Sequence, residues 1–175
     1  MPIKTIFLDR DGVINKETNY LHKIEDFKFM DGIFEACHYL KNLEYELIII
    51  TNQSGIERGY YTENDFQIIT HWMLSEFKKK HINILDIFHC PHLHESNCTC
   101  RKPKPGMLLE AKYKHNIDMK NSWLIGDKET DIIAAKNSNI TNTILVRSGH
   151  QISEANSKAK FIIDSVQQIN KIITS

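Results

Sequence analysis

Two aspartates stand two residues apart near the beginning of the chain. Asp9 and Asp11 follow the apolar run from Ile6 to Leu8 and precede Gly12, which can turn the chain sharply. Carboxylates at this spacing repel one another, and they are tolerated where a divalent cation lies between them or where one keeps its proton. The protonated form is what a general acid requires. Taken alone, however, an Asp-Gly turn with solvated carboxylates explains the same residues.

Polar and charged side chains also follow three later apolar runs. The residues from Thr51 to Ser54 offer two hydroxyls and two amides, which suit phosphoryl oxygens, although polar turns between strands and helices are common. Lys102 lies in a segment that prolines stiffen. Asp127 and Asp131 share one face of a helix that begins at about residue 128, where they could also act only as caps. Together with Asp9 and Asp11, four apolar runs are thus followed by side chains that suit phosphoryl transfer. Their combination predicts a single site for this chemistry.

Three of the four cysteines fall within eleven residues. In a cytosolic chain this clustering favours a metal ion over disulfides, and three cysteines with one histidine form a closed tetrahedral zinc site. His89 and His94 are competing imidazoles that we interpret as bystanders, and we interpret Cys37, on the apolar stripe of a helix, as a core residue. Bound zinc would fix the loop that carries Lys102. The predicted zinc ligands are Cys90, His92, Cys98 and Cys100.

Short apolar runs that alternate with helical patterns must position these residues. Nearly continuous apolar runs are typical of strands buried on both faces of a parallel sheet. The alternation predicts an α/β fold with a doubly wound, mostly parallel sheet and helices on both faces, in which ligands bind at the carboxyl ends of the strands. The expected strands are Thr5–Asp9, Glu46–Thr51, Ile84–Cys90, Ser122–Asp127, Asn142–Arg147 and Lys160–Asp164. The expected helices lie around residues 33–43 and 66–77 and over Met107–His115, Glu129–Asn137 and Ser165–Ile173.

The composition excludes several classes of protein. The 175 residues contain 22 Lys and Arg and 22 Asp and Glu, so the formal net charge is zero. Nucleic-acid binders and polybasic membrane-surface proteins need a clear surplus of basic residues, and a membrane helix needs roughly 20 apolar residues in succession. We therefore expect a cytoplasmic protein that binds neither nucleic acid nor membrane. The length and the lack of a linker indicate one domain over residues 1–175, and since no sequence feature argues for oligomerisation, we expect a monomer by default.

Two connections are longer than the sheet needs. They cover about residues 10–31 and 91–105, and loops of this length in a compact domain are usually functional. No region is long enough to form a separate cap domain. We therefore expect an open site whose substrates are small phosphorylated metabolites.

The order of these motifs resembles the haloacid dehalogenase (HAD) superfamily of aspartyl phosphatases. Within the superfamily, the sequence is similar to the D-glycero-D-manno-heptose 1,7-bisphosphate 7-phosphatases and shares much with histidinol-phosphatase domains. The resemblance spans about residues 6–149. The motifs that carry it are Asp9-Arg10-Asp11-Gly12, Thr51-Asn52-Gln53-Ser54-Gly55, Cys98-x-Cys100-Arg101-Lys102-Pro103 and Gly126-Asp127-x-x-x-Asp131.

The resemblance implies a phosphatase reaction with two displacements at phosphorus. Asp9 would be the nucleophile that forms an aspartyl-phosphate, and Asp11 the acid and then the base. Thr51 and Lys102 would hold the phosphoryl oxygens, while Asp131 would have a less direct role. Mg²⁺ would bind to Asp9, to the backbone carbonyl of Asp11 and to Asp127, and zinc would be structural.

The resemblance also implies the residues that contact the substrate, a small phosphorylated sugar. Arg101 and Lys128, at the rim, would suit the second phosphate of a heptose bisphosphate. Thr18 and Asn19 depart from the family's sugar-binding pattern, and the zinc loop lacks an insertion found in some relatives. The implied contact residues are Glu17, Tyr20, Asn52, Gln53, Ser54, Arg101 and Lys128.

Other functions remain as alternatives. Histidinol phosphate or a nucleic-acid 3′-phosphate would undergo the same chemistry. A zinc-stabilised binding module without catalysis would require degraded acid or metal positions, and these are intact. Dehalogenase chemistry is disfavoured because Asp11 would have no acid role when the leaving group is a halide.

Overall fold

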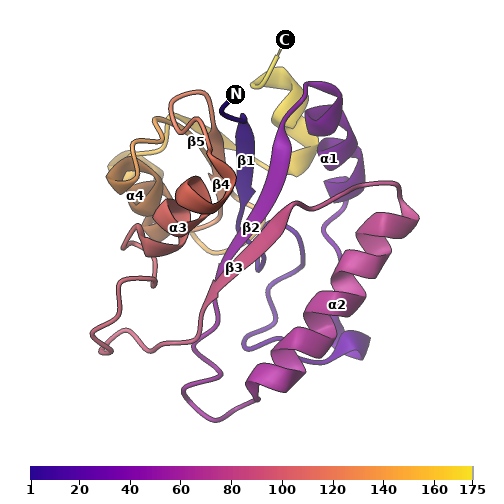
Figure 1. Ribbon diagram of the computed structural model, residues 1–175, viewed down its shortest axis with the longest axis vertical. Helices are drawn as coiled ribbons and strands as arrows, with labels where there is room; N and C mark the ends of the chain where they lie inside the picture. The colour runs from indigo at the N-terminus through magenta and orange to yellow at the C-terminus, as the bar shows by residue number, and fades with distance from the viewer. Residues whose placement is uncertain (175) are drawn as a thin grey trace.

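The computed structural model describes residues 1–174 and contains a six-stranded sheet in which every neighbouring pair of strands is parallel (Figure 1). The strand order is β3-β2-β1-β4-β5-β6. This is the order of a doubly wound α/β fold, so the predicted fold class is confirmed. The strands are β1 (Thr5–Leu8), β2 (Glu46–Asn52), β3 (Asp86–Cys90), β4 (Trp123–Gly126), β5 (Asn142–Val146) and β6 (Phe161–Ile163).

Alternate residues of the central strands supply two separate hydrophobic cores. Ile6 of β1 and Leu47 of β2 pack on the face covered by α1 and α2, whereas Phe7 and Ile48 pack on the face covered by α3 and α4 (Figure 1). Both faces are buried, which explains why these strands are apolar without alternation. The helices are α1 (Ile33–Asn42), α2 (Glu63–Lys79), α3 (Gly106–His115) and α4 (Glu129–Asn137).

The chain after β6 differs from its prediction. The α-helix expected over Ser165–Ile173 is instead a 3₁₀ helix, η3 (Val166–Lys171). Val166 and Ile169 are buried three residues apart, and in a 3₁₀ helix residues at this spacing lie in line along one face. The β-branched side chains here also favour an α-helix less than straight ones do. Two further 3₁₀ turns are η1 (Ile24–Asp26) and η2 (Glu154–Asn156).

The sheet creates a crevice between β1 and β4. These strands are neighbours, and the chain leaves β1 toward β2 on one side but leaves β4 toward β5 on the other. Ligands of doubly wound folds bind at such a point, outside the carboxyl ends of the strands. The two long connections, residues 9–32 and 91–105, both begin at this edge of the sheet (Figure 1). No helix among residues 1–174 is long and apolar enough to cross a membrane.

Candidate active site

A cavity of about 460 Å³ lies at the carboxyl edge of the sheet. The predicted catalytic and magnesium-binding residues Asp9, Asp11 and Lys102 line this cavity. The other two, Thr51 and Asp127, are buried and lie outside its lining. All of the predicted substrate-contact residues line it. The predicted residues in the lining are Asp9, Asp11, Glu17, Tyr20, Asn52, Gln53, Ser54, Arg101, Lys102 and Lys128, and Asn19, Arg58, Tyr61, His94, Pro103, Thr130, Asp131 and His150 join them.

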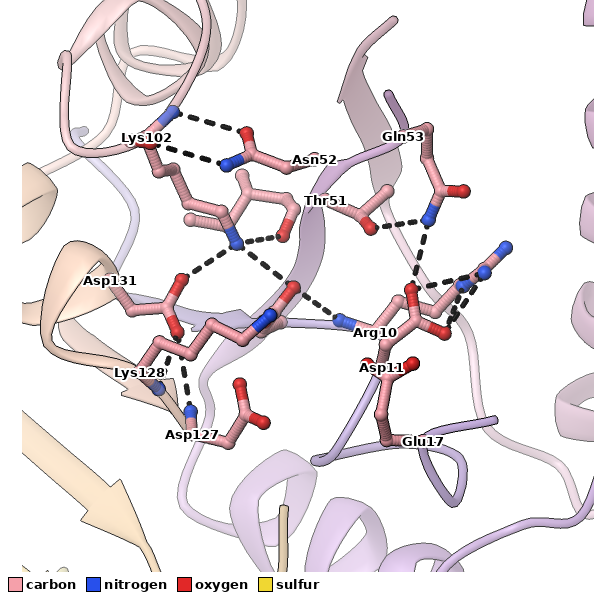
Figure 2. Close-up of polar contacts among 12 residues, drawn as sticks. Arg10, Asp11, Glu17, Thr51, Asn52, Gln53, Lys102, Asp127, Lys128 and Asp131 are labelled. Carbon is pink, nitrogen blue, oxygen red and sulfur yellow. Dashed lines mark hydrogen bonds and ion pairs between the residues drawn. The ribbon is translucent and has the colours of Figure 1, made fainter. Parts of the chain in front are cut away.

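Lys102 is a buried cation between two carboxylates. Its Nζ lies 2.7 Å from Asp131 Oδ1 (Figure 2). It also lies 2.9 Å from Asp9 Oδ1 and donates a hydrogen bond of 3.0 Å to the carbonyl of Ile50. Burial disfavours the charged form, but the nearby Asp131 and Asp9 outweigh it and raise the pKa of Lys102. The lysine therefore stays protonated and supplies a fixed positive charge to the cavity.

Asn52 holds the backbone of this lysine against the end of β2. Its amide donates to the carbonyl of Lys102 over 3.2 Å and accepts from the N–H of Lys102 over 3.1 Å (Figure 2). Both bonds tie the loop after β3 to its neighbouring strand. The structure thus gives Asn52 a supporting contact, and its predicted contact with substrate stays a prediction.

Three buried aspartates form a carboxylate cluster beside Lys102. One oxygen from each of Asp9, Asp127 and Asp131 lies within 4.8 Å of the others. Burial, reinforced by the charges of Asp131 and Asp127, raises the pKa of Asp9 well above its ordinary value, although Lys102 opposes this shift. Three acidic side chains thus share a single lysine, and a cation bound among them would favour the ionised form of Asp9.

The cluster fits a hard divalent cation. Asp127 Oδ1 is buried and has no hydrogen-bond partner among the described residues. Asp131 is occupied, since its Oδ2 accepts from the backbone N–H groups of Asp127 and Lys128 over 3.2 and 3.1 Å (Figure 2). An orphaned carboxylate oxygen within an all-oxygen donor set is what Mg²⁺ requires. Asp131, for which the resemblance implies a less direct role, contacts Lys102 and orients the turn after β4.

Asp11 points to a different set of partners. Arg10 Nη2 contacts both of its carboxylate oxygens, at 2.9 and 3.0 Å, and Gln53 donates to it over 3.0 Å (Figure 2). Asn15 also donates to it over 3.0 Å. Burial opposes ionisation, but Arg10 and these hydrogen bonds outweigh it and lower the pKa of Asp11. The sequence reasoning gave Arg10 no role, although a charged residue between the two aspartates was a visible signal.

Gln53 connects Asp11 to the end of β2. Besides its bond to Asp11, its amide nitrogen donates to Thr51 Oγ1 over 2.8 Å, and its oxygen accepts from the Tyr61 hydroxyl over 2.5 Å. Because Thr51 Oγ1 accepts this hydrogen bond, the hydroxyl hydrogen of Thr51 remains available to be donated to another group. Gln53 is held on both sides of its amide and fixes the positions of Thr51 and Asp11.

His150 is a site residue that sequence reasoning missed. It follows β5, and its Nδ1 and backbone N–H lie 2.5 and 3.1 Å from Asp127 Oδ2. Its Nε2 lies 3.7 Å from Glu17 Oε2. The only available signal was a histidine shortly after a predicted strand, without a motif of defined spacing around it.

The predicted zinc ligands also come together. Cys90 Sγ lies 3.8 Å from Cys98 Sγ and 3.5 Å from His92 Nδ1, which lies 3.3 Å from Cys100 Sγ. The edge of a tetrahedron around zinc measures about 3.8 Å between two sulfurs. All of these cysteines are free thiols. The cluster therefore fits a zinc ion in both donor type and spacing.

The two competing imidazoles lie outside this zinc cluster. His89 Nε2 contacts Glu63 over 3.0 Å, and its ring packs on Phe66. His94 lines the cavity. Arg101 joins the cluster to the cavity, because its Nη1 donates to the carbonyl of His92 over 3.0 Å.

Comparisons with known proteins agree on the family. Residues 99–169 match the model of a HAD-hydrolase-like family. The chain is 47% identical over 178 residues to a D-glycero-α-D-manno-heptose-1,7-bisphosphate 7-phosphatase of Photorhabdus laumondii, with 98% of this chain and 97% of the relative covered. It is 56% identical over 146 residues to an enzyme of the same name from Campylobacter jejuni, covering 83% and 84%. It is 43% identical to a Pasteurella multocida enzyme named for the β anomer, covering 97% and 96%.

A solved structure extends this agreement to the fold. The D,D-heptose 1,7-bisphosphate phosphatase of B. bronchiseptica, solved with magnesium and phosphate, superposes with a TM-score of 0.84 at 25% identity and covers 97% of each chain. Identities above 40% across nearly the whole chain, together with this fold and carboxylate cluster, leave one assignment. The chain belongs to the D-glycero-D-manno-heptose-1,7-bisphosphate 7-phosphatase family of the HAD superfamily.

Proposed function

We propose that this protein is a magnesium-dependent phosphatase that removes the 7-phosphate of D-glycero-D-manno-heptose 1,7-bisphosphate. The observation that carries the proposal is the arrangement of Asp9, Asp127 and Lys102 at the carboxyl edge of the sheet, in a chain whose relatives are named for this reaction. The products are inorganic phosphate and heptose 1-phosphate.

Asp9 is the proposed nucleophile. Lys102 and the Arg10 N–H both contact its Oδ1, at 2.9 and 2.8 Å, which orients the carboxylate. An oxygen of Asp9 bonds to phosphorus while the bond from phosphorus to the sugar oxygen breaks, and the enzyme becomes an aspartyl-phosphate. Water then attacks phosphorus and regenerates the Asp9 carboxylate with release of phosphate.

Asp11 is the proposed acid and base. Because its pKa is lowered, the carboxyl group of Asp11 is ionised. The ionised carboxylate is the base that takes a proton from the attacking water. In the first step Asp11 must instead donate a proton to the sugar oxygen. An incoming phosphate would favour its protonated form, because like charges disfavour an ionised carboxylate.

Lys102 and Thr51 would stabilise the phosphoryl oxygens. Lys102 supplies a fixed charge that needs no reorganisation, and the hydroxyl hydrogen of Thr51 can donate from the end of β2. Asp9 and Asp127 would hold Mg²⁺, with the carbonyl of Asp11 as a further ligand. When bound, this ion neutralises charge on the transferring phosphoryl group.

The rim of the cavity suits a second, unreacted phosphate. Arg101 and Lys128 line it, and nothing in the described residues pairs Lys128 with a carboxylate. A guanidinium can bind phosphate with two hydrogen bonds. Glu17, Tyr20 and Ser54 would contact the sugar between the two phosphates. The relatives include enzymes named for both anomers, so the anomer remains for experiment.

A phosphate-release screen tests the substrate. We expect the enzyme with Mg²⁺ to hydrolyse one or both anomers of heptose 1,7-bisphosphate at least about tenfold more efficiently, in kcat/KM, than histidinol phosphate or fructose 1,6-bisphosphate, since a missed buried contact costs about that much or more. Heptose 1-phosphate, which lacks the reacting group, is the control. Faster release from histidinol phosphate would favour that alternative and contradict the heptose assignment.

We also propose that Cys90, His92, Cys98 and Cys100 bind a structural zinc ion. The four ligands leave no position for water, so the ion would act through the loop it holds. That loop carries Lys102 two residues after the last ligand. The monomeric state and the cytoplasmic location stay predictions.

A metal analysis tests the zinc site. Reduced, unchelated protein is expected to contain about one equivalent of zinc, and Cys100→Ser is expected to lose most of it. Cys37→Ala is the control, because Cys37 is buried in the other core, on α1, and should leave the zinc content unchanged. Less than about half an equivalent in the unaltered protein would contradict the site.

A further inference from the structure

His150 occupies one oxygen of the buried Asp127 carboxylate with two hydrogen bonds. Its Nδ1 and its backbone nitrogen lie 2.5 and 3.1 Å from Oδ2. An ionised carboxylate can only accept, so both nitrogens donate. The other oxygen, Oδ1, is the buried atom without a partner among the described residues. The two oxygens of one carboxylate are therefore sharply distinguished.

The surrounding backbone keeps Asp127 in this orientation. A Cβ atom built on Gly12 or on Gly149 would lie 2.2 Å from Asp127 Oδ2, so both loops approach the carboxylate as closely as glycine allows. Gly12 also has a φ of +87°, in the left-handed region. Rotation of the carboxylate would break both bonds to His150 and meet one of these loops.

The imidazole ring is itself held between two acids. On the side away from Asp127, its Nε2 lies 3.7 Å from Glu17 Oε2. Glu17 is in turn fixed, because its Oε1 accepts from the N–H of Asn19 over 2.8 Å. A chain of contacts thus runs from the carboxylate cluster through His150 to the wall of the cavity.

We infer that His150 is a positioning residue that makes Asp127 a one-oxygen ligand and thereby favours Mg²⁺ over Ca²⁺. The inference rests on the magnesium site proposed above. Mg²⁺ takes single oxygens in near-ideal octahedral geometry, whereas Ca²⁺ accepts both oxygens of one carboxylate. With Oδ2 held by His150, only Oδ1 is left for the cation.

Two variants separate hydrogen bonding from packing. His150→Leu removes the side-chain donor, whereas His150→Asn keeps an amide nitrogen near the place of Nδ1. Mg²⁺ and Ca²⁺ are titrated into substrate-free enzyme by isothermal calorimetry. We expect His150→Leu to weaken Mg²⁺ binding about 10- to 100-fold, the usual effect of losing a partner of a metal ligand, and to weaken Ca²⁺ binding much less. His150→Asn should bind both ions within a few-fold of the unaltered enzyme.

Two outcomes would overturn the inference. Unchanged Mg²⁺ binding in His150→Leu would show that Asp127 needs no side-chain partner, and an equal loss in both variants would show that the ring acts by packing. If the unaltered enzyme itself bound no Mg²⁺, the proposed metal site would fail instead. Should His150→Leu not fold, His150→Gln, whose amide is displaced by one methylene, takes its place with the same expectation.

Discussion

Asp9→Asn is expected to abolish magnesium-dependent phosphate release while the protein stays folded. The amide is close in shape to the carboxylate but is a very poor nucleophile, so turnover should fall by at least about 10⁴-fold. The melting temperature of the metal-free protein should change by only a few degrees. The variant loses its ion pair with Lys102, but it also loses the repulsion that Asp131 and Asp127 exert on the Asp9 carboxylate.

Steady-state phosphate release and circular dichroism check this result together. Asp26→Asn is the matched control, since Asp26 is exposed in η1 and should leave turnover unchanged. A second readout is mass spectrometry of acid-quenched enzyme, in which the unaltered protein should carry phosphate on the peptide that contains Asp9. Normal turnover in Asp9→Asn would remove the nucleophile assignment.

The fold could be predicted because its signals are local in the sequence. The run from Leu47 to Ile50 is apolar throughout because both faces of β2 are buried. The helix α4 has the bounds that were expected, Glu129–Asn137. The α-helix expected over Ser165–Ile173 is instead the 3₁₀ helix η3, in which the buried Val166 and Ile169 lie three residues apart, a spacing that suits either kind of helix and so could not distinguish them in the sequence.

In the candidate site, too, some contacts could be predicted from the sequence and others could not. Lys102 and Asp9 are 93 positions apart, yet both follow strands whose carboxyl ends share one edge, so their meeting follows from the parallel sheet. His150 contacts Asp127 through the close approach of two loops, which no spacing in the sequence encodes. Likewise, the amides of Asn52 and Gln53 indicated phosphate binding, but their contacts with Lys102 and Asp11 depend on how the loops pack.

Lys102→Met is the second change with a large expected effect, and it should affect both turnover and stability. Removing a charged donor to the transferring phosphoryl group is expected to lower kcat about 10³-fold. The variant also leaves Asp9 and Asp131 buried without their cation, and breaking a buried pair by removing one partner costs about 3–5 kcal/mol. The free energy of unfolding of the metal-free protein should fall by roughly that amount in urea titrations.

Magnesium distinguishes the electrostatic cause from a packing defect in Lys102→Met. A cation bound to the same carboxylates would offset part of their repulsion, so Mg²⁺ should stabilise Lys102→Met more than it stabilises the unaltered protein. The control is Lys78→Met, an exposed lysine near the end of α2, which should change neither turnover nor stability. If Lys102→Met lost stability that Mg²⁺ did not restore in any part, the loss would come from the methionine side chain rather than from unpaired carboxylates. If it kept full turnover, the phosphoryl-binding role of Lys102 would be wrong, and the positive charge in the cavity would have to come from its other basic lining residues, Arg58, Arg101 and Lys128.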